Sequence, residues 1–105
     1  MSLIDEHVAR FNTGVRTGDW EPMLELFADD ARLEFIGIPV GPFEGRDGIR
    51  AAYGTQPPDD EILLLPDRRR YAWSREPERP AGEIQLVECD GRIASLRILY
   101  ETFSA

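Results

Sequence analysis

The sequence has 105 residues, a length typical of one domain, and 42% of them are hydrophobic, as in globular chains with a core. The formal net charge of −8 repels phosphate backbones, so binding of nucleic acid would need a separate basic face, and we interpret the basic run at residues 68–70 as a solvated stretch beside acidic residues 59–61. Cys89 is the single cysteine, which excludes an internal disulfide and gives no sign of an oxidising compartment.

The first segment predicts an amphipathic helix over residues 3–16. Ser2 can cap its start, with Asp5 three residues later, and Gly18 breaks the pattern. Apolar residues recur at helical spacing, at Ile4, Val8, Phe11 and Val15. The one histidine of the sequence, His7, lies on this helix, so a nucleophile paired with a histidine could be built only here.

A second helix is expected over residues 19–29, with Asp19 as its cap and Pro22 in its first turn. Its buried stripe consists of Trp20, Met23, Leu24 and Phe27. The adjacent carboxylates Asp29 and Asp30 come at its end. A reactive pair would need a shared, desolvated site that raises one pKa, which adjacent residues at an exposed turn rarely form. We interpret the two aspartates as junction residues before the next strand, with a catalytic pair as the alternative.

The remaining chain predicts one more helix and a set of β-strands. Alternation of apolar and polar residues indicates a strand at 32–36, followed by a return segment rich in Pro and Gly. A third helix, over 45–54, ends at Gly54. Four strands then follow, over residues 61–65, 69–74, 82–89 and 92–103. They are joined in pairs by turns at Pro66-Asp67 and at Asp90-Gly91, and the second is the strongest hairpin signal in the sequence.

The sequence carries no signal for secretion, membrane insertion or metal binding. The opening residues contain acids and no continuous apolar stretch, and no window approaches the ~18 apolar residues that a membrane helix needs. No cluster of His, Cys and carboxylate residues has metal-ligand spacing, and no phosphate-binding loop is visible. We therefore expect a cytoplasmic, single-domain protein over residues 1–105 that uses no metal or cofactor and binds neither nucleic acid nor membranes.

Three stretches of the sequence, together with the order of the predicted elements, carry a resemblance to a known family. The stretches are TGDWEPMLELFADDARLEF, FEGRDGIRAAY and DGRIASLRILYETF. They resemble the nuclear transport factor 2-like superfamily, and more closely its branch of ketosteroid isomerases and SnoaL-like polyketide cyclases. The resemblance covers most of the chain. It implies an α+β, cone-like fold in which three helices pack in a curved antiparallel sheet, with an apolar pocket at the open end.

The resemblance also implies positions for catalytic residues. In ketosteroid isomerases an aspartate near the end of the first strand moves the proton, and that position falls on Phe35. Their oxyanion hole joins a tyrosine of the first helix to a protonated aspartate, and these positions fall on Phe11 and Glu83. Two supporting tyrosines fall on Phe27 and Tyr53. The base is therefore missing, and one carboxylic acid and one tyrosine of the set remain.

Two glutamates leave alternatives open. Glu34 is next to the lost base position, but alternation sends its side chain to the face opposite Phe35, so it could substitute only if a bulge intervened. Glu83 shares a strand face with Gln85 and Val87. If it is buried there, desolvation keeps its carboxyl protonated and able to donate a hydrogen bond. The alternative is an ionised residue at the rim.

Two functions follow from these positions. The first is a small isomerase- or cyclase-like enzyme that transfers a proton on a hydrophobic carbonyl compound of steroid or polyketide type, with Glu83 as the acid and Tyr53 in support. The second is a module of the same fold that binds a small hydrophobic molecule, or a partner, without turnover. Phenylalanine at the base and oxyanion positions favours the second function, because it makes the pocket drier and more apolar.

The pocket and the assembly can be stated as expectations. We expect the pocket to be lined by Phe11, Leu33, Phe35, Tyr53, Trp73, Glu83, Gln85, Leu96, Ile98 and Tyr100. Within the last strand, alternation separates one face from the other, with Leu96, Ile98 and Tyr100 facing the pocket. The habit of the superfamily and the apolar residues of the outer sheet face predict a homodimer, those residues being Leu63 or Leu65, Ala94 and Leu99.

Overall fold

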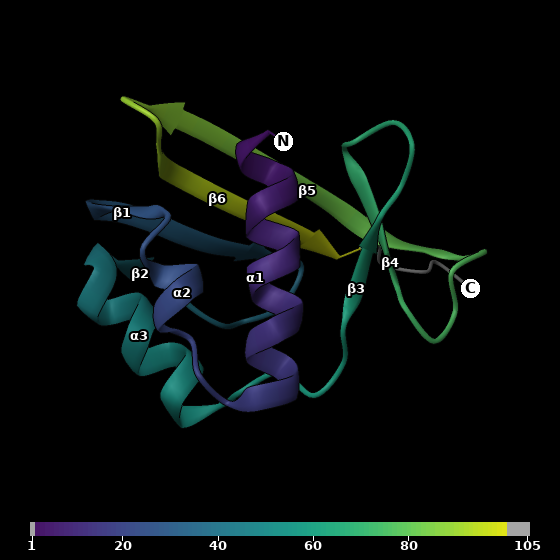
Figure 1. Cartoon of the computed structure of the whole chain (residues 1–105), viewed down its shortest axis with the longest axis horizontal. Helices are drawn as coiled ribbons and strands as arrows, with labels where there is room; N and C mark the ends of the chain where they lie inside the picture. The colour runs from purple at the N-terminus through teal and green to yellow at the C-terminus, as the bar shows by residue number, and fades with distance from the viewer. Residues whose placement is uncertain (1, 101–105) are drawn as a thin grey trace.

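Six strands form one curved sheet, and the helices lie in its hollow (Figure 1). The computed structural model describes residues 2–100. In chain order the elements are α1 (Leu3–Thr17), α2 (Glu21–Leu24), β1 (Phe27–Ile36), β2 (Phe43–Glu44), α3 (Gly45–Thr55), β3 (Ile62–Leu64), β4 (Arg70–Trp73), β5 (Pro80–Cys89) and β6 (Arg92–Tyr100). The strands are arranged in the order β2-β1-β6-β5-β4-β3. The predicted α+β cone is confirmed.

Helix α1 forms for the reasons that its sequence indicates. The side chain of Ser2 accepts a hydrogen bond from the backbone N–H of Asp5. At the other end Gly18 takes the left-handed conformation, with φ of 80°, and its N–H donates to the carbonyl of Gly14 at 2.8 Å. The buried face of the helix carries His7, Val8, Phe11 and Gly14. This face therefore points into the hollow of the sheet.

The expected second helix over 19–29 is wrong in its length. Helix α2 has only 4 residues, Glu21–Leu24, and the chain is already extended at Phe27. Asp19 was expected as the cap, but the N-cap is Trp20, which makes no side-chain cap bond; the side chain of Asp19 accepts from the N–H of Glu21 at 3.1 Å in the turn before the helix. The helix stops because the backbone beyond it pairs with the sheet, where Leu26 accepts a hydrogen bond from Ile93 at 2.8 Å.

Asp29 and Asp30 accordingly lie within strand β1 and not at a helix end. The pairing of β1 with β6 is irregular between Phe27 and Arg32, which leaves both aspartates exposed. Asp29 forms an ion pair with Arg46 at 3.3 Å. The two carboxylates share no buried site, so the geometry supports the structural interpretation of the pair.

The sheet is antiparallel except at one position. Strands β1 and β6 run parallel, with Leu33 opposite Leu96 and Phe35 opposite Ile98. A parallel pair needs a long crossover, and here α3 and β3 to β5 supply it. The β5–β6 hairpin turns at Asp90 and Gly91, which both have positive φ, as a tight two-residue hairpin requires.

The other predicted elements are found close to their expected bounds. Helix α3 and strands β3 and β4 differ from expectation by a residue or two, and β5 begins earlier, at Pro80. Residues 101–103 of the expected last strand lie outside the described residues. The turn at Pro66-Asp67 is held by the Asp67 carboxylate, which accepts from the N–H groups of Arg69 and Arg70 at 3.0 Å.

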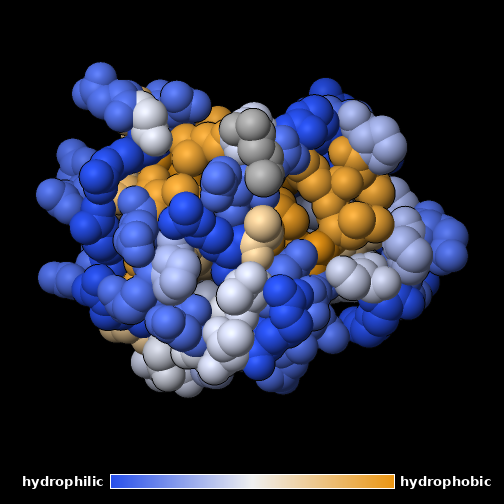
Figure 2. Space-filling model, in the orientation of Figure 1, coloured by the Kyte–Doolittle hydropathy of each residue, from blue (hydrophilic) through white to orange (hydrophobic). Residues whose placement is uncertain are grey.

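The core fills the space between the helices and the concave face of the sheet. Its largest fully buried side chains are Phe27, Met23, Leu24, Leu33, Ile49, Ile84, Ile93, Leu96 and His7. Hydrophilic residues cover most of the face in Figure 2, with apolar residues showing between them. Within residues 2–100 no helix is long and apolar enough to cross a membrane.

Candidate functional site

A cleft with two adjoining chambers opens inside the cone. The outer chamber has a volume of about 290 Å³ and is lined by Leu33, Phe35, Ile38, Val40, Phe43, Ala52, Tyr53, Gln56, Pro58, Asp59, Asp60, Trp73 and Tyr100. The inner chamber has a volume of about 80 Å³ and is lined by His7, Phe11, Phe35, Tyr53, Pro58, Ile62, Tyr71, Trp73, Ile84, Ile98 and Tyr100. The chambers share Phe35, Tyr53, Pro58, Trp73 and Tyr100, so they form one continuous site.

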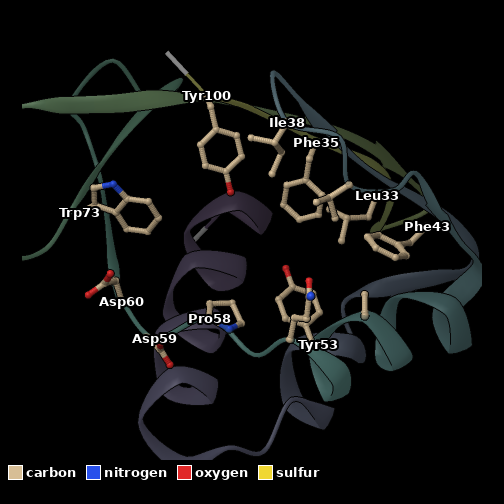
Figure 3. A pocket seen from close by; sticks show the side chains of 13 residues that line it. Leu33, Phe35, Ile38, Phe43, Tyr53, Pro58, Asp59, Asp60, Trp73 and Tyr100 are labelled. Atoms are coloured by element: carbon tan, nitrogen blue, oxygen red, sulfur yellow. The ribbon is translucent and has the colours of Figure 1, made fainter. Parts of the chain in front are cut away.

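Side chains from distant parts of the chain meet around the outer chamber (Figure 3). Tyr53 from α3 and Tyr100 from the end of β6 face each other across it, and Phe35 from β1 lies beside them. Trp73 from β4 forms the opposite wall. The curvature of the sheet brings these elements together, since β1, β6 and β4 all contribute to the same concave face.

Burial keeps the histidine and the tyrosines of the cleft neutral. Desolvation, with a smaller contribution from Tyr100, raises the pKa of Tyr53 and of Tyr71 well above the usual 10. Burial also raises the pKa of Tyr100. It lowers the pKa of His7 from 6.5 to about 4, because a charged imidazole would lose its hydration there. At pH 7 the inner chamber therefore has uncharged walls.

Among residues 2–100, the charged side chains that line the cleft are found at its mouth. Asp59 and Asp60 belong to the lining of the outer chamber, next to Pro58 (Figure 3). Asp60 forms an ion pair with Arg75 at 3.4 Å. The guanidinium of Arg75 in turn lies 5.9 Å from the centre of the Trp73 ring. A polar group of a bound molecule would thus meet charge only at the entrance.

Two fully buried polar atoms of the inner lining have no hydrogen-bond partner within residues 2–100. Nδ1 of His7 and the hydroxyl oxygen of Tyr71 are both buried, and neither is bonded. The two residues are each only 2% exposed. Buried polar atoms without a partner are uncommon in folded proteins. These two are therefore the fully buried polar groups of the inner lining that the described residues leave unbonded.

The structure corrects the predicted positions of Glu83 and Gln85. Both lie on the outer face of the sheet and line neither chamber. The amide of Gln85 donates to the carboxylate of Glu83 at 2.9 Å, and Arg69 lies 3.8 Å from the same carboxylate. The physical reason is the register of β5 against β6. Ile84 is paired with Ile98, and paired residues share a face, so Ile84 faces the cleft and its neighbours point outward.

The other predicted residues divide between the cleft and the core. The structure places Leu33, Phe35, Tyr53, Trp73 and Tyr100 around the outer chamber, and Phe11 and Ile98 around the inner one. Leu96 is completely buried and lines neither chamber. Glu34, the alternative base, lies on the outer face, where Arg32 and Arg97 are 3.4 and 3.7 Å from its carboxylate.

Several lining residues were not predicted as site residues, and two of them had a signal in the sequence. His7 precedes Phe11 by one helical turn, so both lie on the same face of α1. Tyr71 precedes Trp73 by two residues on β4 and shares its face. The segment around Pro58 had no such signal, because it is a loop whose path depends on the fold. Within residues 2–100 no group of His, Cys, Asp and Glu side chains is arranged to hold a metal ion.

We compared the chain with protein families and with curated sequences. The pattern of the SnoaL-like domain matches residues 8–63, which is more than half of the chain. No curated protein sequence matches.

Solved structures resemble the whole fold. An NTF2-like protein of Anabaena variabilis matches with a TM-score of 0.61 at 12% identity, over 96% of this chain and 88% of that chain. A Mycobacterium tuberculosis protein in complex with estradiol-17β-hemisuccinate matches with a TM-score of 0.60 at 19% identity, over 93% of each chain. A computationally designed binder of 17-OHP matches with a TM-score of 0.58 at 19% identity, over 96% and 92%. At these identities the likeness is one of fold.

Proposed function

The chain belongs to the SnoaL-like domain family, and from that premise we propose that its cleft binds a small, uncharged and largely hydrophobic molecule. The observation that carries the proposal is the lining of the inner chamber, which consists of apolar and aromatic side chains, one neutral histidine and no charged residue. Such a lining makes the transfer of an apolar ligand from water into the cleft favourable in free energy. A charged ligand would lose its hydration there without gaining an ionic partner.

The class of ligand is that of compact polycyclic compounds of steroid or polyketide type. A flat molecule fits between the aromatic walls formed by Phe35, Tyr53, Trp73 and Tyr100. Two structural neighbours were solved or designed with steroid-type ligands, estradiol-17β-hemisuccinate and 17-OHP. Their likeness of fold supports this class of ligand.

A titration with estradiol tests the proposal. Trp73 lines both chambers, so binding is expected to change the tryptophan fluorescence in a saturable way. The variant Phe35→Asp is expected to lose most of this affinity at pH 7, because it places an unpaired carboxylate in the apolar lining. Ala9→Asp is the matched control, since it adds the same group on an exposed position of α1. Saturable binding that Phe35→Asp leaves unchanged would refute a site in this cleft.

A proton-transfer enzyme is the second candidate, and one observation favours it. The imidazole of His7 lines the inner chamber, and its Nδ1 has no partner among the described residues, so a group that can accept a proton is present even though the family resemblance puts Phe35 at the position of the isomerase base. The acid assigned to Glu83 does not belong to this mechanism, because Glu83 lies outside the cleft.

Turnover separates the two candidates. A β,γ-unsaturated ketosteroid becomes conjugated when it is isomerised, and ultraviolet absorbance follows the reaction. Binding of the ketosteroid without conversion supports the binding function. Conversion that is lost in His7→Leu, with binding retained, would establish the enzyme instead.

A further inference from the structure

The inner chamber combines an apolar lining with two unsatisfied polar atoms. His7 from α1 and Tyr71 from β4 both line this chamber, and Nδ1 of the first and the hydroxyl of the second are buried without a hydrogen-bond partner among the described residues. Each residue is buried to 98%, as its exposure of 2% shows. A buried polar atom that loses water and gains no partner costs free energy in the folded state. Two of them around one cavity indicate that the partner enters from outside.

The neighbouring groups do not supply that partner. Ring contacts surround His7, with the ring of Phe27 at 5.7 Å and that of Phe11 at 6.4 Å between centroids. Tyr71 contacts Trp73 edge to face at 5.9 Å. These contacts fix the two rings in place but bond neither polar atom. The positions of the rings are therefore set by packing, and their polar atoms remain available to a ligand.

The space in the chamber is large enough for a ligand group. Its volume of about 80 Å³ exceeds by several times the roughly 10–15 Å³ that one water molecule requires. It also adjoins the outer chamber, so the end of a ligand that occupies the outer chamber can enter it.

The hydrogen-bonding capacity of Nδ1 of His7 and of the Tyr71 hydroxyl indicates which polar group of a ligand they would bind. A neutral imidazole nitrogen either donates or accepts, according to its tautomer, and a tyrosine hydroxyl can do both. A carbonyl oxygen only accepts, so it suits one tautomer of His7. A hydroxyl donates and accepts, so it suits both tautomers and Tyr71 as well. An anion is disfavoured because no cation lines the chamber.

We propose that the hydrophobic ligand carries a hydroxyl group on the end that enters the inner chamber, and that His7 and Tyr71 are the residues that bind it. This inference rests on the proposed function and assigns the orientation of the ligand. The ring system lies among the aromatic walls of the outer chamber, and the hydroxyl points inward. His7 and Tyr71 are then the residues that make the cleft bind a phenol or an alcohol more tightly than a hydrocarbon of the same shape.

A pair of small probes of nearly equal shape tests the proposal. 2-Naphthol carries the hydroxyl, and 2-methylnaphthalene replaces it with a methyl group. In the unmodified protein 2-naphthol is expected to bind more tightly. In Tyr71→Phe the affinity for 2-naphthol is expected to fall about five- to tenfold, as the loss of one hydrogen bond predicts, while that for 2-methylnaphthalene changes less than about twofold.

The test with Tyr71→Phe requires that the variant folds. NMR spectroscopy of the unmodified protein gives a second test that does not. His7 is the one histidine of the sequence, so the imidazole ¹⁵N signals of the chain belong to it. We expect 2-naphthol to shift them at saturation through a hydrogen bond, and 2-methylnaphthalene to shift them far less.

The possible failures are distinguishable. If neither probe binds, the proposed function is wrong and the inference falls with it. If both bind with equal affinity, Tyr71→Phe alters neither, and the His7 signals respond equally to both, the cleft binds apolar molecules but the assignment of a hydroxyl to His7 and Tyr71 is overturned.

Discussion

The imidazole of His7 is packed among apolar and aromatic side chains, and its protonation links stability to pH. In the folded chain burial lowers the pKa of His7 from 6.5 to about 4, and no charged side chain lines the chamber beside it. Between these two values the unfolded chain binds the proton and the folded chain does not. The contribution of His7 to stability is therefore fully present above pH 6.5 and is lost as the pH falls toward 4.

The expected size of this effect is measurable. Between pH 7 and pH 5 the protein should lose about 2 kcal/mol of unfolding free energy through His7, from about 1.4 kcal/mol for each pH unit below the unfolded pKa of 6.5. Urea unfolding at the two pH values measures it. His7→Phe should unfold with a smaller pH dependence, whatever its absolute stability. An equal dependence in the variant would show that other groups cause the loss.

At the scale of single residues, the sequence predicts the composition of the site better than its geometry. Phe35 and Tyr53 were expected at the cleft from family positions, and both line it. Glu83 and Gln85 were assigned to the wrong face, because alternation shows which residues share a face but not which face is inside. That choice is made by the pairing of β5 with β6. Burial of His7 depends likewise on its packing against Phe27, a residue of another element.

At the scale of elements, the contact of α1 with α2 depends on a missing side chain. Gly14 is buried in α1, and a Cβ added there would overlap the six-membered ring of Trp20. The ring of Trp20 also stacks near Tyr53, with centroids 4.8 Å apart. The glycine thus lets a tryptophan approach the helix backbone and support a residue of the cleft.

Gly14→Ala is expected to destabilise the fold by about 1–3 kcal/mol, because the tryptophan ring or the helix must shift to make room. Gly48→Ala is the matched control. It also lies in a helix, its added Cβ would meet no atom within 4 Å, and it should stabilise by about 0.5–1 kcal/mol. Thermal unfolding of both variants measures the difference. If the two changes had the same sign, the close approach of Trp20 would not matter for stability.

Elements with strong local signals could be predicted from the sequence, and the others could not. Helix α1 has a cap at each end, and the β5–β6 hairpin has its Asp-Gly turn, so their existence follows from nearby residues. The end of α2 is different. Residues up to Phe27 continue a helical pattern, but pairing of Leu26 with Ile93, which is far away in the sequence, competes with the helix and prevails.

At the scale of the whole molecule, we predict a homodimer formed through the outer face of the sheet. Leu63 and Val87 are 44% and 56% exposed, which leaves apolar area in water. The same face carries Glu83 and Arg97, so a second copy could bury the apolar residues and pair the charges. Light scattering at micromolar concentration should then give about twice the chain mass of 11.9 kDa.

The variant Val87→Asp tests the location of this interface. It should shift the protein toward the chain mass of 11.9 kDa, because a carboxylate would be buried between the copies. Ala51→Asp, on an exposed position of α3, serves as the control. A protein that already has the mass of one chain at micromolar concentration would contradict the prediction.

The central position of β6 in the sheet has a consequence for the folding of the nascent chain during its synthesis on the ribosome. Strand β6 lies between β1 and β5, yet it is the last strand of the described chain to be synthesised. Until it emerges, β1 has the two-residue strand β2 on one side and lacks its long neighbour on the other, so a buried residue such as Phe27 has no paired strand. Closing so long a loop is entropically costly and slow. While β6 is still inside the exit tunnel, the part of the chain that has emerged should therefore have its cone open and its apolar edge accessible to chaperones, and the β5–β6 hairpin should close the cone once β6 emerges.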